Sequence, residues 1–238
     1  MADIIVVTPS RGRAARLREM VEAVHSTALG DVRVMVGLDL DDPADYEATI
    51  PEWVGNISSY RGPRKSLCGW TNHLALQALD GPNPPRYLAS LGDDHRPRTH
   101  GWDRVLIEAI ENMAGPGFAY GNDLLQGKAM PTAWVVSAEV VRALGWMMLP
   151  GCAHMYVDAA VLALGQAAGR IAYRADVIVE HVHPLAGKAS WDTSYRESNA
   201  DGRYAADRAA FEAWRVEQLA ADVTAVETLV YERQARGA

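Results

Sequence analysis

Apolar residues come in two rhythms along the first half of the chain. Three short runs are mostly apolar, as expected of buried strands, and they lie at residues 4–8, 32–38 and 87–91. Each run is followed by apolar positions at helical spacing, at residues 11–28, 66–79 and 99–113. Strand and helix alternating in this way predict an α/β fold with a mostly parallel central sheet and helices on both faces.

The second half is less regular. Strands are expected at residues 133–137 and 170–180, and helices at residues 138–144 and 155–168. Residues 187–203 are polar and bounded by glycines, and this pattern favours a flexible lid over a ligand, with a mobile connector as the alternative.

Residues 204–238 predict a C-terminal helical extension, made of one helix or a helix pair, beyond a main domain at residues 1–186. The extension has an apolar stripe of Phe211, Trp214, Leu219, Val223, Val226 and Val230. Such an apolar stripe must be buried against another surface. We therefore expect it to dock on the main domain or on a second subunit, so that a homodimer through this helix is one expectation.

Composition and charge exclude several classes of protein. Of the 238 residues, 49% are hydrophobic and 22% are charged, which is ordinary for a globular protein with a core. The formal net charge of −7 gives no overall attraction to nucleic acid or anionic lipid. Cys68 and Cys152 lack metal-finger spacing and are expected to be buried thiols in a reducing compartment. No signal peptide or membrane span is evident, so a cytoplasmic protein without membrane contact is expected.

The segment Leu91-Gly92-Asp93-Asp94-His95 directly follows the third expected strand. Ligands of α/β sheets bind at the carboxyl ends of the strands. Adjacent carboxylates repel each other unless a positive charge lies between them, and Mg²⁺ or Mn²⁺ prefers carboxylate oxygen while keeping positions open for phosphate. The segment therefore predicts a metal site, with a solvated turn before the next helix as the alternative.

Two histidines follow the last expected strand, in Glu180-His181-Val182-His183-Pro184. Residues two apart on an extended chain face the same side, so both rings could point toward one site. His183 is preferred over His181 as a metal ligand, and a structural histidine is the alternative.

Six segments together resemble the GT-A glycosyltransferases, in particular the family 2-like enzymes of bacteria and phages. The segments are IIVVTPSRGR at 4–13, VGLDLDD at 36–42, GPRKSLCGWTN at 62–72, YLASLGDDHRP at 87–97, HMYVDAAVLALGQAAGR at 154–170 and VIVEHVHP at 177–184. They occur in the family's order and cover about residues 1–190. The resemblance implies a Rossmann-like nucleotide-diphospho-sugar transferase fold and a hexosyltransferase in the cytoplasm, or in the host cytoplasm if the chain is phage-encoded.

The resemblance also implies a donor site. Residues at the positions that hold the nucleoside are Thr8, Pro9, Arg11 and Arg13. Asp39 lies where an acid commonly meets the uracil ring, so a UDP-sugar is the expected donor. Lys65 and Asn72 fall near the donor diphosphate and ribose.

Asp93 and Asp94 match the DxD-type metal motif of these enzymes, but His95 replaces the third acid, which leaves open which of the three residues binds the metal. Asp94 is preferred, with Asp93 on the donor side. His183 matches the histidine that completes the metal shell in some members. Asp158 matches the acid that serves as the base of inverting members.

The implied reaction moves a sugar from the nucleotide diphosphate to an acceptor. Mn²⁺ or Mg²⁺ held by Asp94 would neutralise the charge that builds on the leaving phosphate. Lys65, or Lys188 and Arg196 from the lid segment, would add positive donors. Asp158 would take the acceptor's proton, which gives inversion. Asp123 and His154 are candidates for the acceptor side.

Each role has a structural alternative. Arg11 and Arg13 also fit a solvated helix start, Asp39 fits a hydrated turn, and Lys65 fits a surface lysine. His154 and Asp158 are four residues apart and also fit a hydrogen-bonded pair on a helix.

Two other functions compete with transfer. One is a sugar-nucleotidyltransferase, although residues 9–13 contain one glycine where those enzymes have a glycine-rich loop. The other is a non-catalytic nucleotide-sugar-binding module. No GxGxxG, P-loop, GxSxG or HExxH motif is present, which disfavours dehydrogenases, P-loop NTPases, serine hydrolases and zinc peptidases. The acceptor stays open between modified DNA, protein, a glycan and a small molecule.

Overall fold

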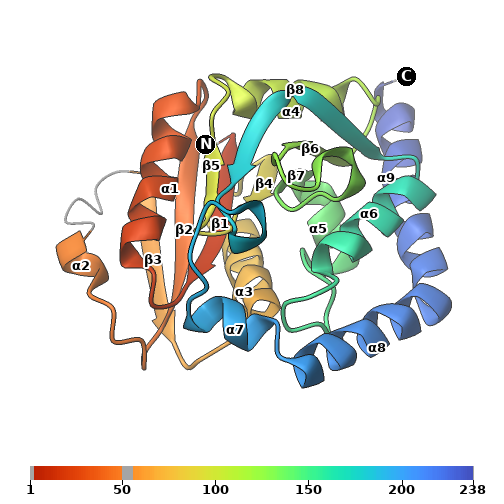
Figure 1. The fold of residues 1–238 in the computed structure, drawn as a ribbon. Coiled ribbons are helices and arrows are strands. Elements are labelled where there is room, and N and C mark those ends of the chain that lie inside the picture. The colour runs from red at the N-terminus through yellow and green to blue at the C-terminus, as the bar shows by residue number, and fades with distance from the viewer. Residues whose placement is uncertain (1–2, 50–55, 238) are drawn as a thin grey trace.

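A computed structural model describes residues 3–49 and 56–237 (Figure 1). Its strands are β1 (Ile4–Ser10), β2 (Val32–Asp39), β3 (Ile57–Gly62), β4 (Tyr87–Ser90), β5 (His95–Pro97), β6 (Phe118–Asn122), β7 (Trp134–Ser137) and β8 (Ile171–His181). Its α-helices are α1 (Ala14–Thr27), α2 (Tyr46–Thr49), α3 (Leu67–Asp80), α4 (Trp102–Glu111), α5 (Ala138–Leu144), α6 (Val157–Ala167), α7 (Thr193–Ser198), α8 (Asp201–Glu217) and α9 (Leu219–Gly237). Two short 3₁₀ helices, η1 (Gly127–Ala129) and η2 (Pro184–Ala186), lie in loops.

The eight strands form one curled sheet in the order β3-β2-β1-β4-β7-β6-β8-β5. The first four strands are parallel, as the alternating pattern predicts. The sheet is mostly parallel, as predicted, but two strands run the other way: β7 is antiparallel to both β4 and β6, and β5 is antiparallel to β8. Strands β6 and β8 pair in parallel with each other. The architecture is therefore a mixed α/β fold.

The long strand β8 joins the two parts of the sheet. Its first half pairs with β6, the register shifts after Gly121, and its last residues pair with β5, so that His181 lies opposite His95. At the shift the two backbones come so close that a Cβ on Gly121 would collide with the carbonyl of Val177. In Figure 1 this strand arches across the molecule toward the centre of the sheet.

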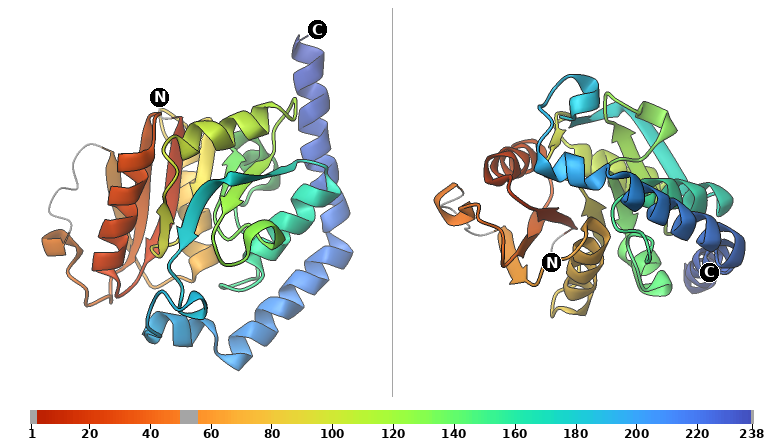
Figure 2. Two further views of the ribbon diagram at one scale, coloured as in Figure 1. Left: turned by 45° about the horizontal axis from the view of Figure 1, so that its top comes forward. Right: turned by 60° about the horizontal axis from the view of Figure 1, so that its bottom comes forward.

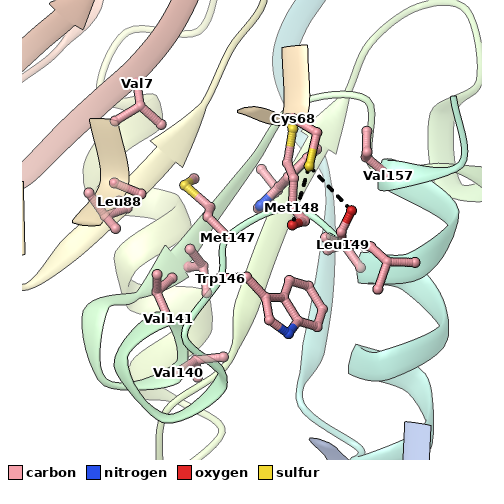
Figure 3. Packing of buried hydrophobic residues seen from close by; sticks show 14 of the residues in the cluster. Val7, Cys68, Leu88, Val140, Val141, Trp146, Met147, Met148, Leu149 and Val157 are labelled. Atoms are coloured by element: carbon pink, nitrogen blue, oxygen red, sulfur yellow. Dashed lines mark hydrogen bonds between the residues drawn. The ribbon is translucent and has the colours of Figure 1, made fainter. Parts of the chain in front are cut away.

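Apolar side chains fill both faces of the sheet. On one face, α3, α5 and α6 pack on strand residues such as Val7 and Leu88. On the other face, α1 and α4 cover residues such as Ile4 and Val34. Figure 3 shows part of the first core, where the Cys68 thiol donates to the carbonyls of Met148 and Leu149.

The two cysteines lie in the first core as free thiols, as expected. Burial raises the pKa of Cys68 to about 12 and that of Cys152 to about 11. Both sulfurs are therefore protonated and unreactive near neutral pH.

The C-terminal region is a helix pair. Helix α8 runs along the bottom of the molecule in Figure 1, and α9 turns upward beside α5 and α6, ending beyond the body of the domain in Figure 2. Phe211, Trp214 and Val226 of the apolar stripe are buried in the first core of the same chain. The stripe thus docks on its own domain, and a homodimer through it stays a prediction. None of the described helices is long and apolar enough to cross a membrane.

Candidate active site

A cavity of about 810 Å³ opens at the carboxyl ends of β1, β2 and β4, where a parallel sheet places its ligands. Its walls come from those strand ends, the start of α3, the loop before α6, the end of β8 and the segment with α7. The predicted site residues that line it are Pro9, Arg11, Arg13, Asp39, Lys65, Asp93, Asp94, His154, Asp158 and His183.

Asp39 is held by groups from three elements. The Trp70 indole N–H donates to one carboxylate oxygen at 2.7 Å, and the Lys65 backbone N–H donates to the same oxygen at 3.1 Å. The Arg11 guanidinium donates to the other oxygen at 3.0 Å. The indole can reach this position because it crosses β2 at Gly37, where a Cβ would lie 2.8 Å from the ring. Asp39 is thus an ordered acceptor in the wall of the cavity, 3% exposed.

Asp93 and Asp94 are both buried at the carboxyl end of β4. Asp93 accepts from the Ser10 hydroxyl at 2.7 Å and from Arg13 at 3.1 Å, and burial beside Asp94 raises its pKa to about 6. Asp94 is buried as well, but His181 and His95 hold its pKa well below the usual range. Asp94 therefore keeps its negative charge to a lower pH than Asp93 does.

The antiparallel pairing of β5 and β8 places the His95 and His181 rings in a stack with 4.2 Å between centroids. His181 Nε2 lies 3.4 Å from Asp94 Oδ2, and His95 Nδ1 lies 3.3 Å from Asp94 Oδ1. One ligand atom from each of Asp94, His95 and His181 falls within 4.8 Å of the others. Burial opposes protonation of His181, yet Asp123 and Asp94 raise its pKa to about 9. A protonated His181 and the Arg13 guanidinium thus place positive charge beside the two acids.

Helix α7 closes over these acids. The Tyr195 hydroxyl donates to Asp94 Oδ2 at 2.7 Å, and the Arg13 guanidinium lies 3.9 Å from the centre of the Tyr195 ring. Asp192 caps α7, and its carboxylate accepts hydrogen bonds from Nε and Nη2 of Arg13, at 2.8 and 2.7 Å. On the far side of the cavity, Glu197 pairs with Arg64 at 2.5 Å. The segment expected to be a loop at residues 187–203 thus contains a helix that lines the cavity.

The loop before α6 forms the opposite wall. His154 lies in this loop, with Nδ1 3.5 Å from the Ser198 hydroxyl of α7, and burial lowers its pKa to about 4. Asp158 lies in the first turn of α6, and burial raises the pKa of this carboxyl above its usual value. Because His154 precedes the helix and contacts α7, the alternative of a His154–Asp158 pair on one helix is not what the structure shows.

Five predicted site residues lie outside the cavity wall. They are Thr8, Asn72, Asp123, Lys188 and Arg196. Thr8 is fully buried within β1, and Asn72 accepts from the backbone N–H groups of Met147 and Met148, so that it holds the loop after α5.

The other three have partners or positions of their own. Asp123 accepts three backbone N–H groups and the Thr132 hydroxyl, so it shapes the loop around η1 rather than facing an acceptor. Lys188 pairs with Glu180 at 2.7 Å, and Arg196 points to solvent from α7. None of the three lines this cavity, and their donor-side and acceptor-side roles stay predictions.

Several residues at the site were not predicted as site residues. Ser10 and Trp70 fix carboxylates, and Asp192 and Tyr195 bring α7 onto them. His181 joins the ligand cluster in place of His183, whose Nδ1 accepts the backbone N–H of Leu185 instead. The sequence signal for His95 was present in the Asp-Asp-His triplet, but the partnership of His95 with His181 depends on strand register.

A comparison with protein-family models gives no match, and a comparison with curated proteins gives none. Solved structures do match. A mannosyltransferase of Pyrobaculum calidifontis, in complex with GDP-Man and Mn²⁺, is 12% identical and superposes with a TM-score of 0.62 over 100% of this chain and 76% of its own. Glucosyl-3-phosphoglycerate synthase of Mycobacterium tuberculosis, in complex with Mn²⁺, UDP-glucose and phosphoglyceric acid, gives 12% identity and 0.60 over 88% and 78%.

TarS of S. aureus is 10% identical, with a TM-score of 0.58 over 91% of this chain and 73% of the TarS chain. All three are GT-A-type glycosyltransferases. This chain has the GT-A fold. The mixed sheet is thus that of the GT-A fold as well.

Proposed function

We propose that the protein is a glycosyltransferase that moves a sugar from a nucleoside diphosphate, UDP being the expected one, onto an acceptor hydroxyl with inversion at the sugar carbon. The observation that carries this proposal is the meeting, in one cavity, of the Asp94–His95–His181 cluster with Asp39 and Asp158. The fold supports the same conclusion, because the neighbours named above are GT-A-type enzymes.

The cluster fits a divalent cation. One carboxylate and two imidazoles are a donor set for Mn²⁺ and for other first-row divalent metals. His181 Nδ1 is buried without a hydrogen-bond partner in the described chain, since Asp123 Oδ2 is 3.9 Å away, beyond hydrogen-bond range. When bound, the cation supplies charge that stabilises the departing diphosphate. Asp94, His95 and His181 would hold it, with His183 beside them on the cavity wall.

Charged side chains line the part of the cavity near the end of β2. Asp39 and Arg11 lie at the end of β2, where Asp39 would accept an N–H from the base of the donor. Lys65, whose backbone N–H bonds to Asp39, also lines the cavity. Its ammonium lies 5.3 Å from the centre of the Trp70 ring. Among the described residues it has no ion-pair partner. A free cation at this position suits a diphosphate.

Asp158, which lines the cavity, would act as the base. In the proposed reaction the acceptor oxygen forms a bond to the anomeric carbon, and the bond from that carbon to the β-phosphate oxygen breaks. The acceptor's proton goes to the Asp158 carboxylate, and the nucleoside diphosphate leaves with the electron pair. A raised pKa makes Asp158 a stronger base than an exposed aspartate.

A melting-temperature screen tests the proposal. Purified protein is heated with UDP-, GDP- and other nucleotide sugars, with and without Mn²⁺. A donor raises the melting temperature in proportion to its binding, and it does so only with Mn²⁺. The Asp94→Asn variant is expected to lose the Mn²⁺-dependent part, whereas Asp201→Asn, a change at an exposed acid of α8, is the matched control. Pyrophosphate released from a sugar 1-phosphate and a nucleoside triphosphate would instead indicate a nucleotidyltransferase.

A further inference from the structure

The wall of the cavity beside α8 carries a pair of aromatic side chains. Tyr156, from the loop before α6, and Tyr204, from α8, have ring centroids 5.2 Å apart and hydroxyl oxygens 2.9 Å apart. Phe211 stacks on the other side of Tyr156 at 5.4 Å. Both tyrosines line the cavity, and Tyr204 is 46% exposed.

This pair is built at an energetic cost. Tyr156 has a φ of 64°, a left-handed conformation that L-residues with a side chain rarely adopt. The loop is held in place by Asp207 of α8, whose carboxylate accepts the backbone N–H groups of Ala153, His154 and Met155 at 2.7, 2.8 and 2.7 Å. Tyr204, Asp207 and Phe211 lie on one face of α8, at i, i+3 and i+7. One helix therefore fixes both the loop and the ring that the loop presents.

A cation accompanies the rings. Arg203 precedes Tyr204, lines the same cavity and is exposed. Within residues 3–49 and 56–237 its guanidinium has no ion-pair partner, whereas Arg11, Arg13 and Arg64 all contact carboxylates. Arginine presents a planar set of donors that matches a phosphate or carboxylate. The interaction left open at Arg203 is thus one with an anion.

We propose that Tyr156, Tyr204 and Arg203 form an acceptor subsite for a sugar ring that carries an anionic group, either phosphate or carboxylate. The apolar C–H face of the ring would pack on the tyrosines while the anion pairs with Arg203. The subsite shares the cavity with Asp158. The inference rests on the proposed function, and it names the acceptor class for that reaction.

Titrations of sugar probes test the subsite, with binding detected by saturation-transfer NMR in the presence of UDP and Mn²⁺. The probes are glucose 6-phosphate, glucuronate and the neutral methyl glucoside. We expect at least one anionic probe to bind more tightly than methyl glucoside, and its preference assigns phosphate or carboxylate. Arg203→Gln should raise the Kd of that probe about tenfold and leave methyl glucoside unchanged. Tyr204→Ala should weaken all three probes.

Matched controls come from the same helical region. Arg208→Gln removes an exposed arginine of α8 outside the cavity wall, and Tyr231→Ala removes a tyrosine of α9 that is 72% exposed. Both should bind the probes like the wild type. Equal binding of charged and neutral probes, or an unchanged Kd in Arg203→Gln, overturns the subsite.

Donor binding distinguishes this failure from failure of the proposed function. A wild-type protein that responds to a nucleotide sugar with Mn²⁺ but binds none of the three sugar probes overturns the subsite alone. A protein that responds to no nucleotide sugar overturns the glycosyltransferase assignment, and the acceptor role of the subsite is lost with it.

Discussion

His154 shows how a single residue couples the cavity to the stability of the fold. Its ring is enclosed by the loop before α6 and by α7, and burial lowers its pKa to about 4, against about 6.5 in an unfolded chain. Between these two values the unfolded chain binds more protons than the folded one. The free energy of unfolding therefore falls as the pH falls from 6.5 to 4, and above pH 7 this contribution is absent.

We expect His154→Gln to flatten this dependence in the protein without ligands. The wild type should lose up to about 3 kcal/mol more than the variant between pH 6.5 and pH 4. Urea unfolding at a series of pH values measures this difference. His100→Gln, a change at an exposed histidine, controls for the loss of one imidazole. Parallel curves for the wild type and His154→Gln would show that the ring is not kept neutral by burial.

Asp207 acts at the scale of elements, because it ties α8 to the loop before α6. Replacing it with alanine leaves three backbone N–H groups without their acceptor, and each buried unsatisfied group costs about 1–3 kcal/mol. We expect Asp207→Ala to destabilise the protein by about 3 kcal/mol or more, as measured by denaturant unfolding. Asp201→Ala, at an exposed acid one and a half turns earlier, should change stability by a few tenths of a kcal/mol, about the size of a helix-end charge effect. Similar losses in both variants would contradict this role.

The elements also show what the sequence can and cannot predict. Six elements begin and end within about three residues of their predicted ends, because each buries a periodic apolar face; they are α1, α3, α6, β1, β2 and β4. Strands β3, β5 and β6 were not predicted. Strand β5 is the three-residue segment His95–Pro97, and it becomes a strand only because β8 lies beside it. Local pattern contains no signal for such pairing.

The same distinction holds for the site. The Asp-Asp-His turn and Asp39 could be predicted because they follow buried strands, whose ends meet at one edge of the sheet. The sequence could not show which of His181 and His183 joins Asp94, because that depends on the register that sets His181 opposite His95. Asn72 and Asp123 were assigned by position in the chain, but their side chains are taken up by backbone N–H groups of neighbouring loops.

At the scale of the whole molecule, the C-terminal helix pair belongs to the domain. Val226 of α9 is fully buried against the first core, whereas Val216 near the end of α8 is 82% exposed. Val226→Ala should lower the free energy of unfolding by about 1–3 kcal/mol, and Val216→Ala should leave it nearly unchanged. Thermal unfolding should show one transition in both variants. A separate early transition in Val226→Ala would mean that the helix pair unfolds independently of the domain.

Side chains fill the part of the cavity beside the acids. Tyr195 and Arg13 occupy the space against Asp94 and Asp93, and Glu197 of α7 pairs across the mouth with Arg64. A cation held by Asp94 would compete with the Tyr195 hydroxyl for this carboxylate. Donor binding is therefore expected to displace α7 from the acids, in keeping with the lid predicted for residues 187–203.

The most direct test measures the initial rate of nucleoside diphosphate release from the donor that the melting screen identifies, as a function of free Mn²⁺. The account predicts release that rises and saturates with Mn²⁺, stops in excess chelator, and falls at least about 100-fold in Asp94→Asn, since transition-state charge stabilisation of this kind is worth several kcal/mol. Release that continues at the same rate in excess chelator, or in Asp94→Asn, would contradict it.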